Sequence, residues 1–439
     1  MKVIREYYLE IFLFLLCFAN LTGAGIPQVL LYPIVLGSAL YKLPFPCIAF
    51  MCVNWLRDVN HAFFFLNFHI SGVAPLTVFI GLALMLKFIL KHQIDILRRG
   101  QNLWFIIALL TISYFIHGNN LYSSDKFSTM LTSSILAYIS YSYILEQREK
   151  CNFFMLALYS TVFAIYLLQL NITANHYGLL SSLMDFGFYR YYVGDDMYMD
   201  LASSGVLYAT HYQFFGTMVC STIALLFATT KIKELQIVVI FIFSIAAIGW
   251  TGARQYIGIL FFLFAAYVLL SQSSALFKIL MVSTGFILLS FILYESILND
   301  YFSVLEEQGV LEGTGREELF DRGVSLFSSH KLWGVGFGGY NYFGNYKAYP
   351  HNLIIEMLAE LGIIGSLILI ISSMFRNKGL HFLYNRKEHF YGAYIVVSLI
   401  LRSLVSLAFC QNIIIFSTLC ALPFASHLMA KTKLTKIKA

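Results

Sequence analysis

Residues 235–270 read LQIVVIFIFSIAAIGWTGARQYIGILFFLFAAYVLL and contain one charged side chain, Arg254. A helix crosses the hydrocarbon core of a bilayer with about 20 apolar residues. This run is therefore too long for one span, and it leaves no room for a loop between two separate spans. It predicts a helical hairpin with a tight turn near residues 251–255.

The whole chain has the composition of a protein that lies in a membrane. The residues AVILMFWYC make up 59% of its 439 positions, charged residues make up 12%, and the mean hydropathy is +0.74. No soluble globular domain of this length approaches these values. They predict an all-α integral membrane protein, one polytopic domain over residues 1–439, with about 12–14 transmembrane helices.

Basic residues between the apolar segments predict how the chain is oriented. Short basic connections lie at 91–99, 148–150, 231–233 and 376–387, and the positive-inside rule makes their side cytoplasmic. The first apolar segment imitates a signal peptide, but apolar sequence resumes at once, so we expect an uncleaved helix. We expect about fourteen apolar spans, at roughly 8–22, 27–41, 43–56, 72–90, 102–117, 129–145, 153–170, 206–228, 235–250, 255–270, 279–294, 353–371, 391–408 and 411–429.

Two long loops are expected on the opposite, extracytoplasmic side, at residues 171–205 and 296–350. Acidic residues outnumber basic ones in both loops, which reverses the balance of the cytoplasmic connections. The parity of the spans and the distribution of charge therefore agree. An external active site fits this layout better than a symmetric carrier does.

Charge and cysteine usage exclude several other partners. The net charge is +6, but most Lys and Arg lie in short loops and at the termini, where orientation accounts for them, so no nucleic-acid partner is expected. The seven cysteines fall within or at the ends of apolar segments, which supports neither a disulfide nor a Cys-based metal site. No cofactor and no metal is expected.

Two arginines on the external side are candidates for binding an anion. Arg254 lies at the tip of the hairpin, where it either snorkels to lipid headgroups or serves as a fixed cation for a phosphate at the membrane surface. Arg316, in Gly313-Thr314-Gly315-Arg316, opens what looks like a short amphipathic helix. There it is either a solvated charge paired with Glu317 or Asp321, or a phosphate ligand beside exposed backbone N–H groups.

A glycine-rich run, Gly334-Val335-Gly336-Phe337-Gly338-Gly339, follows in the same loop. It superficially resembles a phosphate loop, but it has no Lys-Ser/Thr after it and no βαβ context, so a nucleotide site is not expected. We expect these glycines to let the loop turn tightly and approach a ligand or the membrane surface.

A Pro-His-Asn sequence at 350–352 precedes the apolar run 353–371. Asn352, Glu356 and Glu360 recur every four residues, so they share one face of the helix that follows. Two carboxylates that enter a membrane must be partnered or line a polar cavity. A lone interfacial histidine is usually structural, but His351 beside these groups is suited to proton transfer near neutral pH.

Three other polar residues are weaker candidates for a substrate site. Arg190 is the one basic residue of the first long loop, and His211 lies just inside the following span. Arg402 falls in an otherwise apolar span, where it must face protein or water, and it binds phosphate or satisfies a helix terminus or carboxylate.

These motifs resemble those of the O-antigen polymerase and O-antigen ligase superfamily of bacterial membrane glycosyltransferases. The resemblance reaches from Arg190 to Gly365 and is most specific over residues 314–365. It is carried by Gly315-Arg316, Gly334-Val335-Gly336-Phe337-Gly338, His351-Asn352, Glu360-Leu361-Gly362-Ile363-Ile364-Gly365, Thr251-Gly252-Ala253-Arg254 and Arg190-x-x-x-Gly194. One departure is Ala253, where the family often has a serine.

The resemblance implies a C-type glycosyltransferase fold, multi-pass in the bacterial inner membrane, with an active site that faces the periplasm. It implies an inverting, metal-independent transfer of a glycan from undecaprenyl diphosphate. By position, Arg254 and Arg316 would bind the diphosphate, His351 would orient or deprotonate the attacking hydroxyl, and Arg190 would hold glycan or phosphate. Asn352, Glu356, Arg402 and His211, which are candidates from their own positions in the sequence, are added to the expected substrate site.

The motifs do not decide which molecule accepts the glycan or which proteins work with this chain. Likeness over residues 315–319 and compact loops favour a polymerase, which joins lipid-linked repeat units and works with a chain-length regulator and a flippase. The alternatives are a ligase, which transfers the polymer to the lipid A core, a lipid-linked oligosaccharide flippase without chemistry, and a structural or sensory membrane protein. The flippase would need charges near the midplane of several spans, whereas here they gather at one membrane face.

Overall fold

The computed structural model describes residues 8–21, 34, 38, 41, 100–116, 120–146, 216, 219–220, 222–224, 226–227, 234–251, 254–270, 274–298, 316–344, 349–350, 352–374 and 409–421. Nearly all of these residues are helical, and no strand occurs among them. The helices are α2 (Tyr8–Leu21), α8 (Gln101–Tyr114), α9 (Leu121–Glu146), α15 (Glu234–Thr251), α16 (Arg254–Leu270), α17 (Ala275–Leu298), α19 (Arg316–Ser329), α20 (Gly339–Gly344), α21 (Leu353–Met374) and α24 (Phe409–Ala421).

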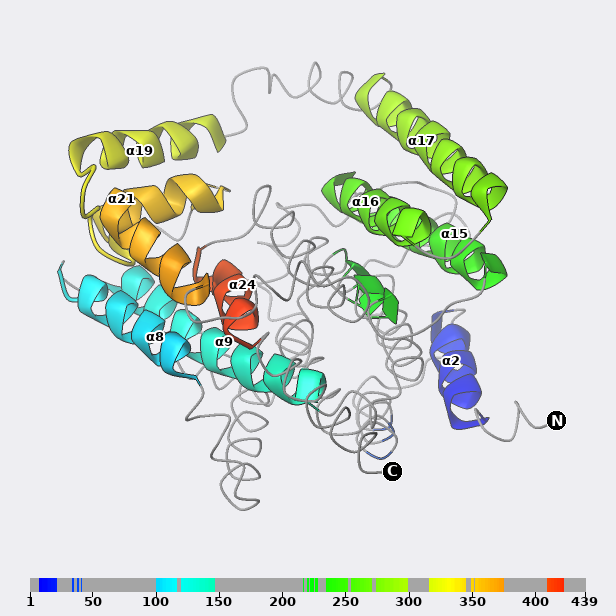
Figure 1. The fold of residues 1–439 in the computed structure, drawn as a ribbon, viewed down its shortest axis with the longest axis horizontal. Coiled ribbons are helices and arrows are strands. Elements are labelled where there is room, and N and C mark those ends of the chain that lie inside the picture. The colour runs from blue at the N-terminus through cyan, green and yellow to red at the C-terminus, as the bar shows by residue number, and fades with distance from the viewer. Residues whose placement is uncertain are drawn as a thin grey trace, which may run out of the picture.

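All the described helices except α2 form two packed groups (Figure 1). In one group, α24 lies along α9, α8 packs against α9 and α21, and α19 covers α21. In the other group, α16 packs against both α15 and α17. The sites predicted around Arg316 and Asn352 belong to the first group, and that of Arg254 belongs to the second.

The predicted hairpin at 235–270 is confirmed as two helices. α15 ends at Thr251 and α16 begins at Arg254, so the turn has the position that the length of the apolar run predicts. Buried side chains of both helices make one core, in which the rings of Phe241 and Phe264 meet edge to face at 4.7 Å. Cys220, from the helical positions described between 216 and 227, joins this core and contacts the carbonyl of Tyr256 at 3.6 Å.

A reciprocal cap fixes the start of α9. The side-chain oxygen of Asn120 accepts the N–H of Ser123 at 2.8 Å, and the hydroxyl of Ser123 accepts the N–H of Asn120 at 3.1 Å. This arrangement satisfies two backbone donors that a helix start leaves free. The amide of Asn120 also reaches the carbonyl of Tyr342 at 3.3 Å, which ties the cap to α20.

Within the described residues, Leu353–Ser373 is the helix long and apolar enough to be a candidate membrane span, with a mean hydropathy of 2.3. The sequence predicts one continuous span here, but the helix is broken at Gly362. This residue has φ 64° and ψ −172°, a conformation that is essentially restricted to glycine. Figure 1 shows α21 bending back at this point, so it consists of a first half before Gly362 and a second half after it.

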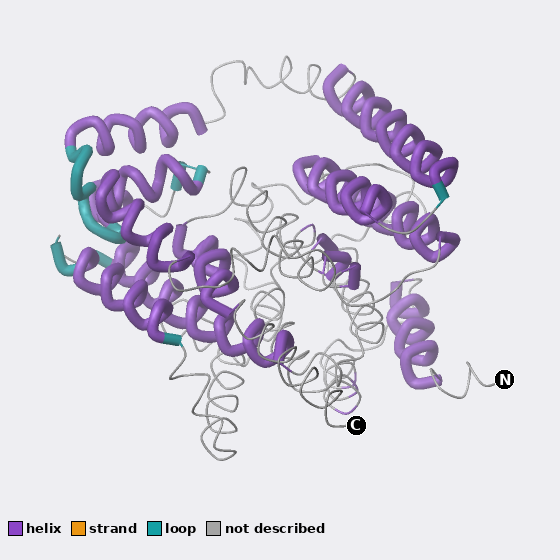
Figure 2. The backbone as a smooth tube through the Cα atoms, in the orientation of Figure 1, coloured by secondary structure: helices purple, strands orange, loops and turns teal. Residues whose placement is uncertain are grey.

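The loop after α19 pairs with the backbone groups that the break sets free. Figure 2 shows this loop lying against the bend of α21. Four backbone hydrogen bonds join them, from Val335 N–H to Ala359 C=O at 3.0 Å, Gly336 N–H to Glu360 C=O at 2.8 Å, Ile363 N–H to Lys331 C=O at 2.9 Å, and Ile364 N–H to Leu332 C=O at 3.0 Å. Two carbonyls at the end of the first half and two N–H groups at the start of the second half therefore have protein partners.

Two glycines, Gly334 of this loop and Gly362 of α21, allow the close contact between them. Gly334 has φ 67°, and a side chain there would collide with the backbone of Glu360. A side chain on Gly362 would in turn collide with the backbone of Leu332. The predicted tight turn is confirmed, because Gly334, Gly336 and Gly338 all have positive φ. Gly334 lies against the broken helix and Gly338 lies against Ser123 of α9, while the predicted approach to a ligand or the membrane surface stays a prediction.

Much of the predicted topology lies outside the described residues. The whole first loop at 171–205 lies there, as do all or most of the expected spans at 27–41, 43–56, 72–90, 153–170 and 391–408. The helical class is confirmed over the part that the structure describes. The total of 12–14 spans and the C-type glycosyltransferase fold stay predictions.

Gly362→Ala should destabilise the protein, because the variant combines a conformation that costs about 1–3 kcal/mol for a non-glycine residue with a collision against the backbone of Leu332. Thermal unfolding in detergent measures the effect. The matched control is Gly258→Ala in α16, where an added Cβ meets nothing within 4 Å. An equal melting temperature for the two variants would contradict this account of the break.

Candidate functional site

Two parallel helices bring separate sequence motifs to one end of the first group. Gly323, in the middle of α19, packs so closely on α21 that a Cβ there would lie 2.6 Å from Cγ2 of Ile355. Past the end of α19, Lys331 bonds to Ile363 just beyond the break. α19 and the first half of α21 therefore run in the same direction (Figure 1), and Arg316 and Asn352 lie at the same end of the pair.

Asn352 caps α21. Its side-chain oxygen accepts the backbone N–H groups of Ile354 at 3.0 Å and Ile355 at 3.2 Å. An asparagine at this position satisfies donors at the helix start and contributes about 1 kcal/mol to helix stability. The cap gives Asn352 a structural role, and its predicted contact with substrate stays a prediction.

A buried lysine holds the two carboxylates of α21. Nζ of Lys126, on α9, lies 2.5 Å from Oε1 of Glu356 and 2.6 Å from Oε1 of Glu360. It also donates to Oδ1 of Asn341 at 3.1 Å. The side chain of Lys126 is 4% exposed, and both carboxylates are fully buried. We call these four residues the lysine cluster.

Further contacts enclose the lysine cluster. The fully buried ring of Phe337 lies 5.7 Å from Nζ of Lys126, measured to its centroid, and the backbone N–H of Phe337 donates to Ser113 Oγ of α8 at 3.0 Å. Tyr340 N–H donates to Oε1 of Glu360 at 3.3 Å. Oε2 of Glu360 is buried and has no hydrogen-bond partner among the described residues. The charges of Lys126, Glu356 and Glu360 are therefore held in direct ion pairs, and Phe337 and Tyr340 shield them from solvent.

Tyr340 also connects the lysine cluster to α19. Its hydroxyl donates to the carbonyl of Leu319 at 2.7 Å, and the guanidinium of Arg322 lies 5.7 Å from its ring centroid. The side chain is fully buried. The orientation of α19, which begins at Arg316, thus depends on the same contacts that bury Glu360.

Lys126 is the residue that the sequence reasoning missed. The predicted need for a partner for Glu356 and Glu360 is confirmed, but that partner was not identified. A signal existed, because residue 126 falls between the expected spans 102–117 and 129–145, on the external side, where orientation does not call for a basic residue. Its separation from Glu356 by 230 positions hides the pairing itself.

The other predicted site residues are placed only in part. α16 begins at Arg254 and α19 begins at Arg316, so the predicted amphipathic helix at Arg316 is confirmed, while both arginine side chains lie outside the described residues. Arg190, His211, His351 and Arg402 lie wholly outside them. The structure brings Arg316 and Asn352 to one end of a helix pair. Arg254 belongs to the other helix group.

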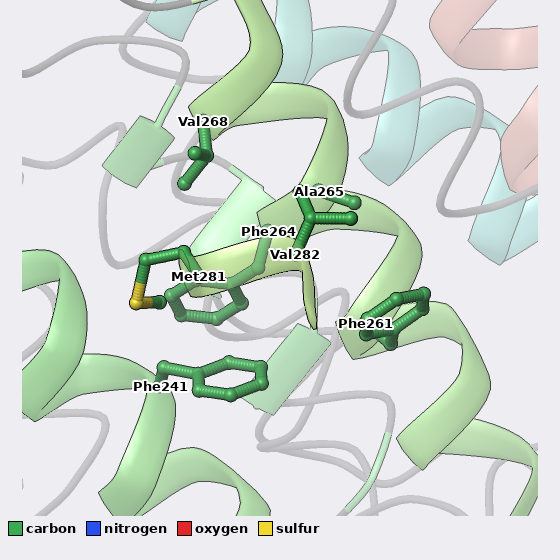
Figure 3. A pocket seen from close by; sticks show the side chains of 7 residues that line it. All are labelled: Phe241, Phe261, Phe264, Ala265, Val268, Met281 and Val282. Atoms are coloured by element: carbon green, nitrogen blue, oxygen red, sulfur yellow. The ribbon is translucent and has the colours of Figure 1, made fainter. Parts of the chain in front are cut away.

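The second helix group contains an apolar hollow between α15, α16 and α17. Figure 3 shows the side chains that line it, which are Phe241, Phe261, Phe264, Ala265, Val268, Met281 and Val282. None of them offers a polar group to a phosphate or a sugar. Over the residues that the structure describes, no three His, Cys, Asp or Glu side chains gather to hold a metal ion.

The fold and this arrangement of charges define a helical protein with a candidate membrane span and a buried polar cluster. Residues 216–370, about a third of the chain, match the family described as O-antigen ligase. The match supports the resemblance of the motifs to the O-antigen ligase and polymerase superfamily, whose members are membrane-associated, glycosyltransferase-like enzymes. The comparison with curated proteins gave no match.

Lys126→Met should destabilise the protein by about 3–5 kcal/mol, because removing one partner of a buried ion pair leaves uncompensated charge. The measurement is thermal unfolding in detergent, with Lys331→Met at an exposed lysine as the control. Combining Lys126→Met with Glu356→Gln and Glu360→Gln should restore part of the loss. A wild-type melting temperature for Lys126→Met would show that the pairing does not support the fold.

Proposed function

We propose that the chain is an O-antigen polymerase, a membrane glycosyltransferase that joins repeat units carried on undecaprenyl diphosphate at the periplasmic face. The family match over residues 216–370 supports glycosyl transfer from a lipid-linked glycan. The observation that carries the proposal is the common end of α19 and α21, where one helix begins at Arg316 and the other begins directly after the His351-Asn352 motif.

This end of the helix pair suits a diphosphate. Each helix start carries the positive end of a helix dipole, which attracts anions. At α21, Asn352 already accepts the N–H groups of Ile354 and Ile355, so the dipole is what this start offers. A guanidinium at the first position of α19 adds a full positive charge with a fork geometry that matches phosphate oxygens. In the proposed site, Arg316 and Arg254 stabilise the negative charge that grows on the leaving diphosphate.

His351 supplies the proton transfer in the proposed reaction. The acceptor hydroxyl attacks the anomeric carbon and gives its proton to the imidazole. The bond between the anomeric carbon and the diphosphate oxygen breaks, the configuration inverts, and undecaprenyl diphosphate leaves. Arg190, His211, Asn352 and Arg402 are proposed to hold the glycan or the phosphates. Glu356, which is buried and paired with Lys126, is proposed to support the site through the position of α21. It lies in the lysine cluster, one helical turn below Asn352.

An O-antigen ligase is the second candidate function. The specific observation in its favour is the description of the matching family, which names a ligase. Both reactions use the same donor and release the same diphosphate, so the proposed roles of Arg254, Arg316 and His351 serve either one. The difference lies in the acceptor, which is another lipid-linked unit in the polymerase and the lipid A core in the ligase.

His351→Ala should abolish long-chain surface polysaccharide while the protein still inserts into the membrane. A lipopolysaccharide gel of a deletion strain complemented with this variant should show core that carries one repeat unit. Bare core with accumulated lipid-linked polymer would instead indicate the ligase. The control is His330→Ala at the exposed end of α19, which should restore the full ladder. If the His351→Ala variant still produced polysaccharide of wild-type chain length, His351 would not be a catalytic residue.

Arg254→Lys and Arg316→Lys should each strongly reduce chain length and transfer rate, because a point charge cannot replace a two-pronged contact with phosphate. Transfer in vesicles with a lipid-linked donor measures the rate. Each variant should unfold at the wild-type temperature, which separates loss of binding from loss of folding. Full activity in both variants would reduce these arginines to surface charges.

A further inference from the structure

The turn that follows α19 presents apolar side chains outward. Leu332 is 59% exposed and Trp333 is 61% exposed, although the backbone of this turn is bonded to α21. The turn belongs to a loop that the sequence places in water, at residues 296–350. Large apolar side chains so exposed in an aqueous loop are costly unless another apolar surface covers them.

The exposed side chains continue onto α21. Ile363 bonds through its N–H to Lys331, next to Leu332, and is 42% exposed. Leu367 follows one turn later on the same side of the helix and is 51% exposed. Leu332, Trp333, Ile363 and Leu367 therefore make one apolar patch at the break, continuous with the outer face of the candidate membrane span.

The length of the second half of α21 sets the depth of this patch. From Ile363 to Met374 the helix has about 12 residues and rises roughly 18 Å. Arg376, the first charged residue beyond it, belongs to a connection predicted to be cytoplasmic. Since the hydrocarbon core is about 30 Å thick, a helix that starts at the cytoplasmic interface reaches Gly362 before it leaves the bilayer.

We propose that residues 332–334 form a re-entrant turn in the outer leaflet, with Leu332 and Trp333 against the acyl chains of bilayer phospholipids and the exposed amine of Lys331 directed toward the headgroups. Irregular backbone is tolerated at membrane depth only where its polar groups are satisfied by protein. Within the turn, the carbonyls of Lys331 and Leu332 accept the N–H groups of Ile363 and Ile364, and the N–H of Gly334 donates to the carbonyl of His330. The apolar patch then meets the lipid. Glu360, two residues before the break, then also lies in the outer leaflet, where an unpaired carboxylate would be costly.

Fluorescence quenching tests the re-entrant turn in the full chain. The background is Trp55→Phe, Trp104→Phe and Trp250→Phe, which leaves Trp333 as the single tryptophan. The protein is placed in vesicles of phosphatidylethanolamine and phosphatidylglycerol without any polyprenyl lipid. Phospholipids brominated in their acyl chains should quench Trp333 strongly, and aqueous iodide should quench it weakly.

The control moves the probe to the other end of α19. Glu318→Trp combined with Trp333→Phe places the single tryptophan at an exposed charged position of the first helical turn, where iodide should be the stronger quencher. Iodide quenching of Trp333 without an effect of the brominated lipids would place the turn in water and overturn the proposal. Absence of quenching by both would indicate a protein cover, which also overturns it.

A labelling experiment gives an independent answer if the triple replacement unfolds. In a chain whose seven native cysteines are replaced by alanine, Leu332→Cys should resist a water-soluble maleimide in intact vesicles, whereas Glu318→Cys should react. Equal reactivity of the two cysteines would overturn the proposal. Solubilisation in detergent followed by denaturation should make both react, which shows that the protection depends on the membrane and the fold.

Discussion

The break of α21 at Gly362 is the constraint on which the rest of the first helix group depends. A helix that stops inside an apolar environment leaves N–H and C=O groups that water cannot reach, and each must find a protein partner. The glycine turn after α19 supplies the partners on both sides of the break. Once that pairing is fixed, the direction of α19 along the first half of α21 and the position of α20 follow.

The lysine cluster is a second constraint. It depends on the break, because the break sets the direction of the first half of α21. The first half of α21 directs Glu356 and Glu360 toward α9, where Lys126 meets both at hydrogen-bonding distance. A buried charge pair adds little stability compared with apolar packing, but it penalises every arrangement in which the charges are separated. The cluster therefore specifies how α9, α20 and α21 fit together.

Both constraints affect the proposed chemistry because they hold the starts of α19 and α21 in fixed positions. A transferase gains from groups held in place before the substrate arrives, because the cost of orienting them is then met by folding. Here two helix starts share one end of a pair that backbone hydrogen bonds, a buried tyrosine and buried ion pairs hold together. The residues proposed to bind the diphosphate lie on these two helices. The glycine-rich run supports them by hydrogen bonding to α21 at its break.

The sequence by itself determined the features that depend on neighbours along the chain. The length of the apolar run at 235–270 required two helices, and the residues around Arg316 and Asn352 carried enough capping and turn information to mark where α19 and α21 begin. Only the tertiary structure decided the break at Gly362 and the partner of Glu356. A glycine in an apolar helix is ordinarily tolerated, so nothing local distinguishes Gly362 from Gly258, which stays helical in α16. The difference arises because a turn from α19 offers hydrogen bonds at one position and not at the other, and because Lys126 approaches from a helix 230 residues away.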